Sequence, residues 1–189
     1  MRGPPDDLSV RAADGDVEAF GRLMKATKSE LYRFVRRYVG DAEESYDLIQ
    51  ETYAAAWLAI RRYDPERPFE TWLRAIAINK CRDWSRRRRV RRWLFGAVDL
   101  DTPQAMAAVD PARDAFDDLA TAQTLARLDR AIAELPPQLK EPLLLTAIET
   151  RSQAEAAAIL GISVKAVQTR VARARRRLAR MLDPDDARR

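Results

Sequence analysis

The sequence from residue 152 to residue 171 reads SQAEAAAILGISVKAVQTRV and predicts two helices joined by a tight turn. Ser152 and Glu155 have the spacing of a capping box, which fixes the start of the first helix. Gly161 stands where that helix must end, because glycine enters the left-handed conformation without a steric penalty. Ser163 can then cap a second helix. The offsets match those of a helix-turn-helix.

Charge on the second helix separates this prediction from its alternative, a plain helical hairpin with glycine in the turn. A solvated helix usually mixes charges of both signs three or four residues apart. Here no acidic residue occurs between Glu155 and Asp183. Apolar residues at three- and four-residue steps predict one buried face: Val164, Val167, Val171, Ala174, Leu178 and Leu182. The remaining surface is cationic, which indicates a polyanionic partner and favours DNA binding.

The position of each polar residue along this second helix suggests its role on DNA. Residues in the first turns of a recognition helix contact base edges, whereas arginines further along suit phosphates. We expect base readout from Lys165, Gln168, Thr169 and Arg173, and phosphate contacts from Arg170 and Arg176. Glutamine pairs preferentially with adenine in the major groove, so Gln168 favours adenine in the recognised element.

Composition limits the class of protein. The 189 residues carry a net charge of +5 and 47% of them are apolar, which suits a soluble nucleic-acid-binding protein with packed cores. The chain has no histidine and a single cysteine, so we expect no disulfide, enzyme activity, metal or cofactor. No apolar run reaches the roughly 20 residues that span a bilayer, and no signal peptide opens the chain. These features predict a cytoplasmic protein without membrane insertion.

Charge also divides the chain into parts. Residues 80–92 contain eight cations and one acid, whereas residues 99–118 contain six aspartates and one arginine, together with two prolines. The acidic stretch lacks a helical period until about residue 116 and reads as a flexible linker with a short helix possible at its end. We predict an N-terminal domain over 1–95, an acidic linker over 96–120, a C-terminal domain over 121–183 and a short tail over 184–189.

Apolar periodicity predicts helices throughout both domains. In the N-terminal domain, we expect helices over 17–39 and 42–60, then a proline-containing loop over 63–68, then a helix from residue 69 into the arginine run. In the C-terminal domain, four helices fit between about residues 121 and 182. No segment alternates with period two, so the predicted class is all-α.

Four segments, in order, resemble one protein family: GDVEAF at 15–20, YDLIQETYAAAW at 46–57, FETWLRAIAIN at 69–79 and LPPQLKEPLLL at 135–145. The family is that of the extracytoplasmic-function sigma factors, small members of the bacterial housekeeping-sigma superfamily. The resemblance spans residues 15–182 and implies two helical domains that recruit RNA polymerase core and direct promoter-specific initiation. The N-terminal domain would melt and read the −10 element, and the C-terminal domain would read the −35 element.

The resemblance also implies partners. These are polymerase core, mainly the β′ clamp helices and also β, promoter DNA in duplex and single-stranded form, and an anti-sigma factor that occludes both domains and can tether the protein to the inner membrane. The segment at 46–57 implies a core-docking surface formed by Asp47, Leu48, Gln50 and Glu51. Acids and amides there complement a basic partner, although the same residues also fit an ordinary solvated helix face.

The matching segments further imply a pocket for −10 bases. Its expected residues are Tyr63, Arg67, Phe69, Trp72, Asn79, Lys80 and Asp83, with the prolines stiffening a loop that captures an unstacked base. The alternative for the polar residues is a helix surface without a role, and for Trp72 it is core packing. Phosphate contacts are expected from Arg82, Arg86, Arg87 and Arg88.

The sequence departs from the family pattern at one position, and two other classes of protein are alternatives to the sigma factor. Family members often carry a basic residue where Gln168 stands, which leaves the −35 sequence open. A conventional helix-turn-helix regulator would dimerise and bind duplex DNA without polymerase. A nucleic-acid enzyme would use Asp47 and Glu51 as metal ligands, but supporting carboxylates at tight spacing are missing from the sequence.

Overall fold

The computed structural model describes residues 7–95 and 117–183, and all regular structure in those ranges is helical. The first four helices are α1 (Asp7–Ala13), α2 (Val17–Val39), α3 (Ala42–Ala59) and α4 (Phe69–Phe95), with a short 3₁₀ turn η1 (Ile60–Arg62) after α3. The second four are α5 (Asp117–Glu134), α6 (Pro137–Leu143), α7 (Gln153–Leu160) and α8 (Val164–Leu182), with a π-helical turn η2 (Leu144–Ile148) after α6. The all-α prediction is confirmed.

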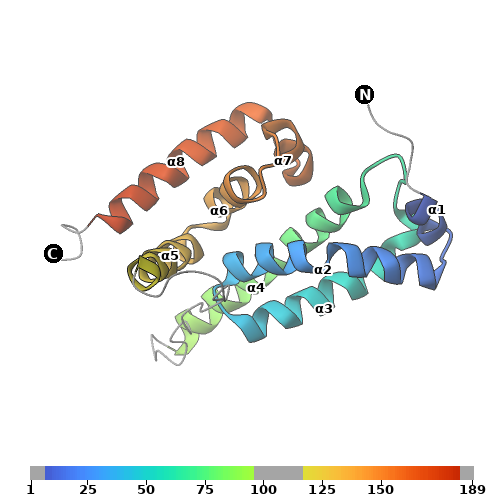
Figure 1. Cartoon of the computed structure of the whole chain (residues 1–189), viewed down its shortest axis with the longest axis horizontal. Coiled ribbons are helices and arrows are strands. Elements are labelled where there is room, and N and C mark those ends of the chain that lie inside the picture. The colour runs from blue at the N-terminus through green and yellow to red at the C-terminus, as the bar shows by residue number, and fades with distance from the viewer. Residues whose placement is uncertain (1–6, 96–116, 184–189) are drawn as a thin grey trace.

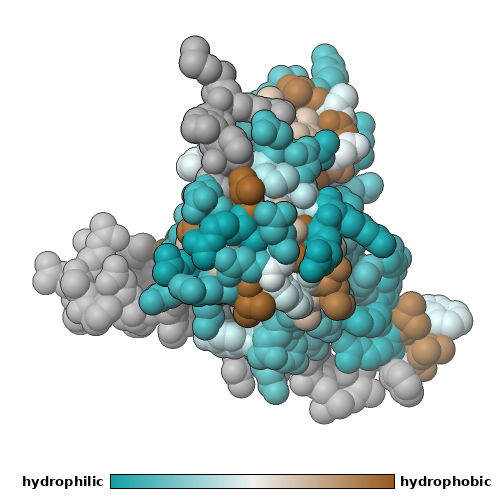
Figure 2. All heavy atoms as spheres, turned by 90° about the vertical axis from the view of Figure 1, so that its right-hand side faces the viewer, coloured by the Kyte–Doolittle hydropathy of each residue, from teal (hydrophilic) through white to brown (hydrophobic). Residues whose placement is uncertain are grey.

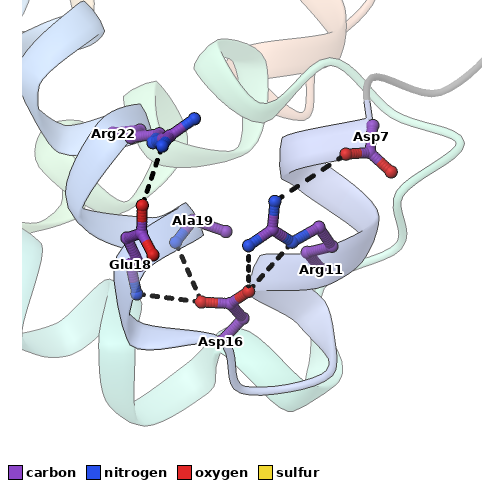
Figure 3. Close-up of polar contacts among 6 residues, drawn as sticks. All are labelled: Asp7, Arg11, Asp16, Glu18, Ala19 and Arg22. Carbon is purple, nitrogen blue, oxygen red and sulfur yellow. Dashed lines mark hydrogen bonds and ion pairs between the residues drawn. The ribbon is translucent and has the colours of Figure 1, made fainter.

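Helix α2 begins and ends where local chemistry dictates. The Asp16 carboxylate caps it by accepting hydrogen bonds from the backbone N–H groups of Glu18 and Ala19 (Figure 3). Gly40 ends it in the left-handed conformation, with φ of 86°. A Cβ at Gly40 would also lie 3.1 Å from the Cβ of Ala133 in α5. Glycine is therefore required both by the backbone and by the close approach of α5.

Helix α1 was not predicted from the sequence. It is tied to the start of α2 by Arg11, whose Nη2 lies 2.6 Å from Oδ2 of Asp16 (Figure 3). The same carboxylate therefore caps α2 and holds α1. Its N–H donors, chiefly Ala19, and the Arg11 guanidinium lower the pKa of Asp16 because they stabilise the ionised form.

Helices α2, α3 and α4 form the core of the N-terminal domain. Their inward faces bury large apolar side chains, among them Leu31 and Phe34 of α2, Leu48 of α3, and Leu73 and Ile78 of α4. Buried residues of these helices recur at three- and four-residue steps, as Leu31, Phe34 and Tyr38 do in α2. The long helix α4 continues beyond this core, so its arginine-rich end projects from the domain (Figure 1).

In the C-terminal domain, α6 and α7 pack against α8. Leu144, Leu145, Val167 and Ala174 are fully buried between them. The predicted buried face of α8 needs one correction, because Val164 is 40% exposed. Val164 is the first residue of α8, where no neighbouring element covers it, so the buried face begins at Val167.

The two domains lie side by side, with α5 to α8 along one flank of α2 and α4 (Figure 1). Among the described residues, polar side chains link them at several places, which include Arg37–Asp129, Tyr38–Lys140, Tyr38–Glu141, Glu70–Arg151, Arg74–Glu149 and Arg82–Glu141. The sequence predicted two domains joined by a linker and made no prediction about contact between them. Helix α5 begins at Asp117, within the segment predicted as linker. Residues 96–116 of that linker and the predicted tail 184–189 lie outside the described residues.

Candidate nucleic-acid interface

Helices α7 and α8 form the helix-turn-helix that the sequence predicts. The Ser152 side chain accepts from the N–H of Glu155, whose carboxylate in turn accepts from the N–H of Ser152, so both bonds of the capping box are made. Gly161 makes the turn with φ of 66°. The hydroxyl of Ser163 accepts from the N–H of Ala166 and caps α8. Local hydrogen bonds therefore fix the residue at which each of the two helices begins.

The predicted base-reading residues lie together on the exposed side of α8. Lys165, Gln168, Thr169 and Arg173 are all exposed. The Thr169 hydroxyl donates to the Lys165 carbonyl at 2.9 Å, which leaves its oxygen lone pairs for a base or water. Gln168 donates from Nε2 to Oε1 of Gln153, the first residue of α7, at 2.8 Å. Sequence reasoning missed Gln153, because a polar residue after a helix cap carries no signal of its own.

The cations of α8 have no acidic partner among the described residues. Arg173, Arg175, Arg176, Arg177 and Arg180 are exposed and Arg170 is half-buried. No ion pair within residues 7–95 and 117–183 involves any of them. Uncompensated guanidinium groups along one helix create a positive potential that attracts a polyanion. The predicted phosphate contacts Arg170 and Arg176 belong to this surface.

The acidic helix α3 presents part of the predicted docking surface. Asp47 and Gln50 are exposed, and Glu51 is half-buried with Oε2 lying 3.4 Å from Nζ of Lys80 in α4. Leu48 is 2% exposed and belongs to the core, so it holds α3 in place and does not offer a contact surface. Tyr46, which sequence reasoning did not select, is 51% exposed and packs against the Tyr32 ring at 4.9 Å.

The aromatic residues predicted to line a −10 pocket form a cluster inside the N-terminal domain. Tyr63 and Phe69 are 4% and 5% exposed, and their ring centroids lie 5.6 Å apart. Trp72 is half-buried and lies 4.9 Å from the Tyr63 ring, as its core alternative predicts. Tyr63 and Phe69 are therefore not available to stack on a base. Their rings pack on each other, and the Tyr63 hydroxyl donates to the Arg67 carbonyl, so these residues hold the loop instead.

The polar pocket candidates lie at or near the surface and each contacts a neighbouring polar or charged side chain. Asn79 is exposed and accepts at Oδ1 from Arg82 at 3.3 Å. Asp83, one turn further along α4, pairs with Arg86. Arg67 is exposed and its Nε lies 3.6 Å from Oδ2 of Asp64. The structure thus brings Asn79, Lys80, Arg82 and Asp83 together on one stretch of α4 and places Arg67 in the preceding loop.

The predicted phosphate contacts of α4 differ in their surroundings. Arg86 and Arg87 are exposed, and Arg88 is half-buried over the Trp84 ring at 5.3 Å. Arg82 instead faces the C-terminal domain. Its Nε and Nη2 donate to the two carboxylate oxygens of Glu141 at 2.8 and 2.6 Å. Glu141 is 1% exposed, so this pair occupies the domain interface.

Two further charged groups are buried where the domains meet. Arg74 of α4 lies 2.6 Å from Glu149, and burial raises the pKa of Glu149. Lys140 of α6 donates from Nζ to the Tyr38 carbonyl at 2.8 Å, and burial lowers the pKa of its ammonium group to about 7. Sequence reasoning missed these residues. The available signal was a lysine and a glutamate, Lys140 and Glu141, inside an apolar run.

The face shown in Figure 2 is mostly hydrophilic, and its apolar patches are small and separate. No group of three or more His, Cys, Asp or Glu side chains in the described residues can hold a metal ion. Within the same residues, no helix has the length and apolar character needed to cross a membrane.

Comparisons with known proteins agree with this architecture. Residues 23–91 match the family Sigma-70 region 2, and residues 125–178 match Sigma-70, region 4. The chain is 40% identical to the RNA polymerase sigma factor CnrH of Cupriavidus metallidurans over 94% of both proteins. It is 37% identical to the ECF RNA polymerase sigma factor SigC of Mycobacterium tuberculosis, over 95% of this chain and 91% of that protein.

A solved structure of CnrH in complex with the cytosolic domain of CnrY is also similar. It is 35% identical to this chain, with a TM-score of 0.68 over 94% of this chain and 96% of the other. The two matched regions coincide with the two helical domains, and the match to region 4 contains the helix-turn-helix. The chain belongs to the extracytoplasmic-function family of RNA polymerase sigma factors.

Proposed function

We propose that this sigma factor binds RNA polymerase core through α3 and reads promoters with α4 at the −10 element and α8 at the −35 element. The observation that carries the proposal is the presence of two cationic helices, one in each domain, together with matches to both sigma regions. A single small module buries only about 600–1,000 Å² on DNA. Two modules held by one polymerase gain affinity because the second contact becomes intramolecular.

Core docking is assigned to the exposed side of α3. Asp47 and Gln50 are accessible there, and Glu51 contributes its partly exposed carboxylate. Acidic and amide groups complement a basic partner such as the β′ clamp helices, which steers association and fixes orientation. Further contacts to the β subunit belong to the same proposal. Leu48 acts only through the core, by holding α3 against α2 and α4.

Recognition of the −10 strand is assigned to the surface of α4 and its preceding loop. Asn79 offers an amide that can both donate and accept at a base edge. Lys80 and Asp83 lie beside it on α4, and Arg67 of the preceding loop adds a further charged group for the melted strand. Arg86, Arg87 and Arg88 continue along the helix and suit phosphates. Tyr63, Phe69 and Trp72 support this surface from beneath.

Promoter binding requires a rearrangement of the two domains. Glu141 occupies the Nε–Nη2 edge of the Arg82 guanidinium, so this edge is not open to a phosphate in this arrangement. We infer that Arg82 exchanges Glu141 for DNA when polymerase core separates the domains. The exchange replaces one anion by another, so Arg82 is never left without a negative partner.

Regulation is assigned to an anti-sigma factor acting in the cytoplasm. The support is the similar structure of CnrH, which is bound to the cytosolic domain of CnrY. A partner that covers α3, α4 or α8 would block polymerase or DNA without changing the fold. Whether that partner sits in a membrane is a property of the partner, since no described helix of this chain can span one.

Run-off transcription with purified bacterial core polymerase tests the proposal. We expect specific initiation from a selected promoter only when this chain is added. A conventional helix-turn-helix regulator would instead bind duplex DNA as a dimer and leave core polymerase inactive. Light scattering on the purified chain and gel filtration with core therefore separate the two functions. Failure to associate with core would overturn the proposal.

A further inference from the structure

We propose that Gln153 sets the base preference of Gln168 by fixing the polarity of its side-chain amide. Gln153 is thus a positioning residue for −35 readout, and this inference rests on the proposed role of α8. The observation is the hydrogen bond from Nε2 of Gln168 to Oε1 of Gln153, at 2.8 Å, between α8 and α7. Both residues are exposed on the surface that carries Lys165, Thr169 and Arg173.

The backbone positions of both glutamines are fixed. Gln153 directly follows Ser152, whose capping box with Glu155 makes two hydrogen bonds of 2.8 and 3.2 Å. Gln168 lies one turn after Val164, behind the cap that Ser163 provides. Only side-chain torsions remain free, and the hydrogen bond restricts those of both residues. Gln168 therefore meets DNA with its amide already oriented.

The donor and acceptor inventory of glutamine explains why orientation matters. A glutamine amide carries one carbonyl oxygen and two N–H groups. Because Gln168 gives one N–H to Gln153, it presents one N–H and its carbonyl oxygen to the groove. That pair complements the N7 acceptor and N6 amino donor of adenine.

The opposite polarity would also admit the other purine. If Gln153 donated and Gln168 accepted, both N–H groups of Gln168 would be free for a base, and its carbonyl oxygen would keep one lone pair. Guanine offers two acceptors, N7 and O6, at the same edge of the major groove. The hydrogen bond from Gln168 to Gln153 withholds one of these two N–H groups, so Gln168 keeps the edge that fits adenine and cannot donate to both guanine acceptors. Gln153 achieves this without touching the base.

Substitutions of Gln153 that fix the hydrogen-bond direction provide the test. Gln153→Glu leaves an acceptor of nearly the same size, and Gln153→Lys leaves a donor only. Gln153→Ala removes the bond. Each variant is assembled with core polymerase and assayed on promoters in which every −35 base pair is varied singly. The measured quantity is the ratio of initiation with adenine to initiation with guanine at the position that Gln168 reads.

We expect Gln153→Glu to retain the adenine preference of the unsubstituted chain. Gln153→Ala should lower the ratio by about fivefold or more, within the range of one bidentate base contact. Gln153→Lys should lower it further, toward guanine. Changes in overall affinity caused by the new charges cancel in the ratio. In a Gln168→Ala background, the Gln153 substitutions should leave the ratio unchanged.

Two results would overturn the inference. One is an unchanged ratio in all three variants, which would make Gln153 a phosphate contact or a surface residue. The other is a shifted ratio that persists in the Gln168→Ala background, which would mean that Gln153 contacts the base itself. Absence of initiation by the unsubstituted chain on every template would refute the proposed function instead. Thermal unfolding of each variant controls for loss of the fold.

Discussion

Arg82 of α4 and Glu141 of α6 form a two-point ion pair across the domain interface, with Nε–Oε1 and Nη2–Oε2 distances of 2.8 and 2.6 Å. The carboxylate is 1% exposed, whereas the guanidinium side chain is 36% exposed. The pair joins residues 59 positions apart in the sequence. It therefore couples the proposed −10 surface to the C-terminal domain.

Removing the arginine should destabilise the protein because it leaves Glu141 buried without its cation. Breaking a buried pair by deleting one partner typically costs about 3–5 kcal/mol, and we expect Arg82→Ala to fall toward the lower end because Arg82 is partly exposed. The measurement is urea unfolding followed by circular dichroism. Arg22→Ala is the matched control, since Arg22 pairs with Glu18 at the surface and exposed pairs contribute only about 0–1 kcal/mol. Equal losses in the two variants would contradict the prediction.

Releasing the arginine without deleting it should have a different effect. Glu141→Gln keeps the size of the side chain and removes its charge, so Arg82 becomes available to phosphate. We expect the free chain to bind a single-stranded −10 oligonucleotide several-fold more tightly, as measured by fluorescence anisotropy at constant salt. Glu18→Gln makes the same change at an exposed pair within one domain and should have little effect. Unaltered affinity in Glu141→Gln would show that the interface does not compete with DNA.

The buried Lys140 predicts a dependence of stability on pH. Its pKa is about 7 in the folded protein and 10.5 in the reference state, so the unfolded chain binds more protons between those values. The free energy of unfolding should therefore rise with pH in this window because of Lys140, by at most about 1.4 kcal/mol per pH unit. The test compares the unsubstituted chain with Lys140→Met from pH 7 to pH 8.5.

The difference between the two unfolding free energies isolates the contribution of Lys140, because other groups titrate in both proteins. The upper limit of pH 8.5 avoids the titration of Cys81. Burial raises the pKa of the Cys81 thiol from 9.0 to about 12, so the free energy of unfolding falls as the pH rises above the pKa of this thiol in the unfolded chain. A pH-independent difference would show that Lys140 remains charged in the folded protein.

Reversing a charge on α3 should weaken polymerase binding. We expect Asp47→Arg to lower affinity for core about tenfold at low salt, since the new cation would face a basic partner. The effect should shrink as salt is raised, because exposed charges are screened beyond about 10 Å at 0.1 M. Glu18→Arg makes the same charge change elsewhere and should bind normally. Equal binding by Asp47→Arg would remove α3 from the docking surface.

The helices were predictable because their signals are local. The capping residues act on backbone groups within four residues, so the signal for each helix boundary lies next to that boundary in the sequence. These residues are Asp16, Gly40, Gly161 and Ser163. The helix-turn-helix and its exposed cations follow from the same short-range rules. Helix α1 was missed because its seven residues are too few to show a period.

The candidate site was only partly predictable. Tyr63 and Phe69 were expected at a DNA-facing pocket, but their rings pack on each other and on Trp72 in the domain core. Aromatic residues serve equally well in cores and on stacking surfaces. Leu48 illustrates the same ambiguity within a polar helix. Asp47 and Gln50 face solvent, but the Leu48 side chain lies on the inward face.

The sequence by itself determined the two helical domains, the helix-turn-helix and the cationic character of α4 and α8, because periodicity, caps and charge act over a few residues. Only the tertiary structure decided which charges remain available. Arg82 and Glu141, or Gln153 and Gln168, meet through packing of helices that are separate along the chain. Hydrogen bonds and ion pairs require atoms within about 3–4 Å. That proximity is a property of the fold, and no local pattern encodes it.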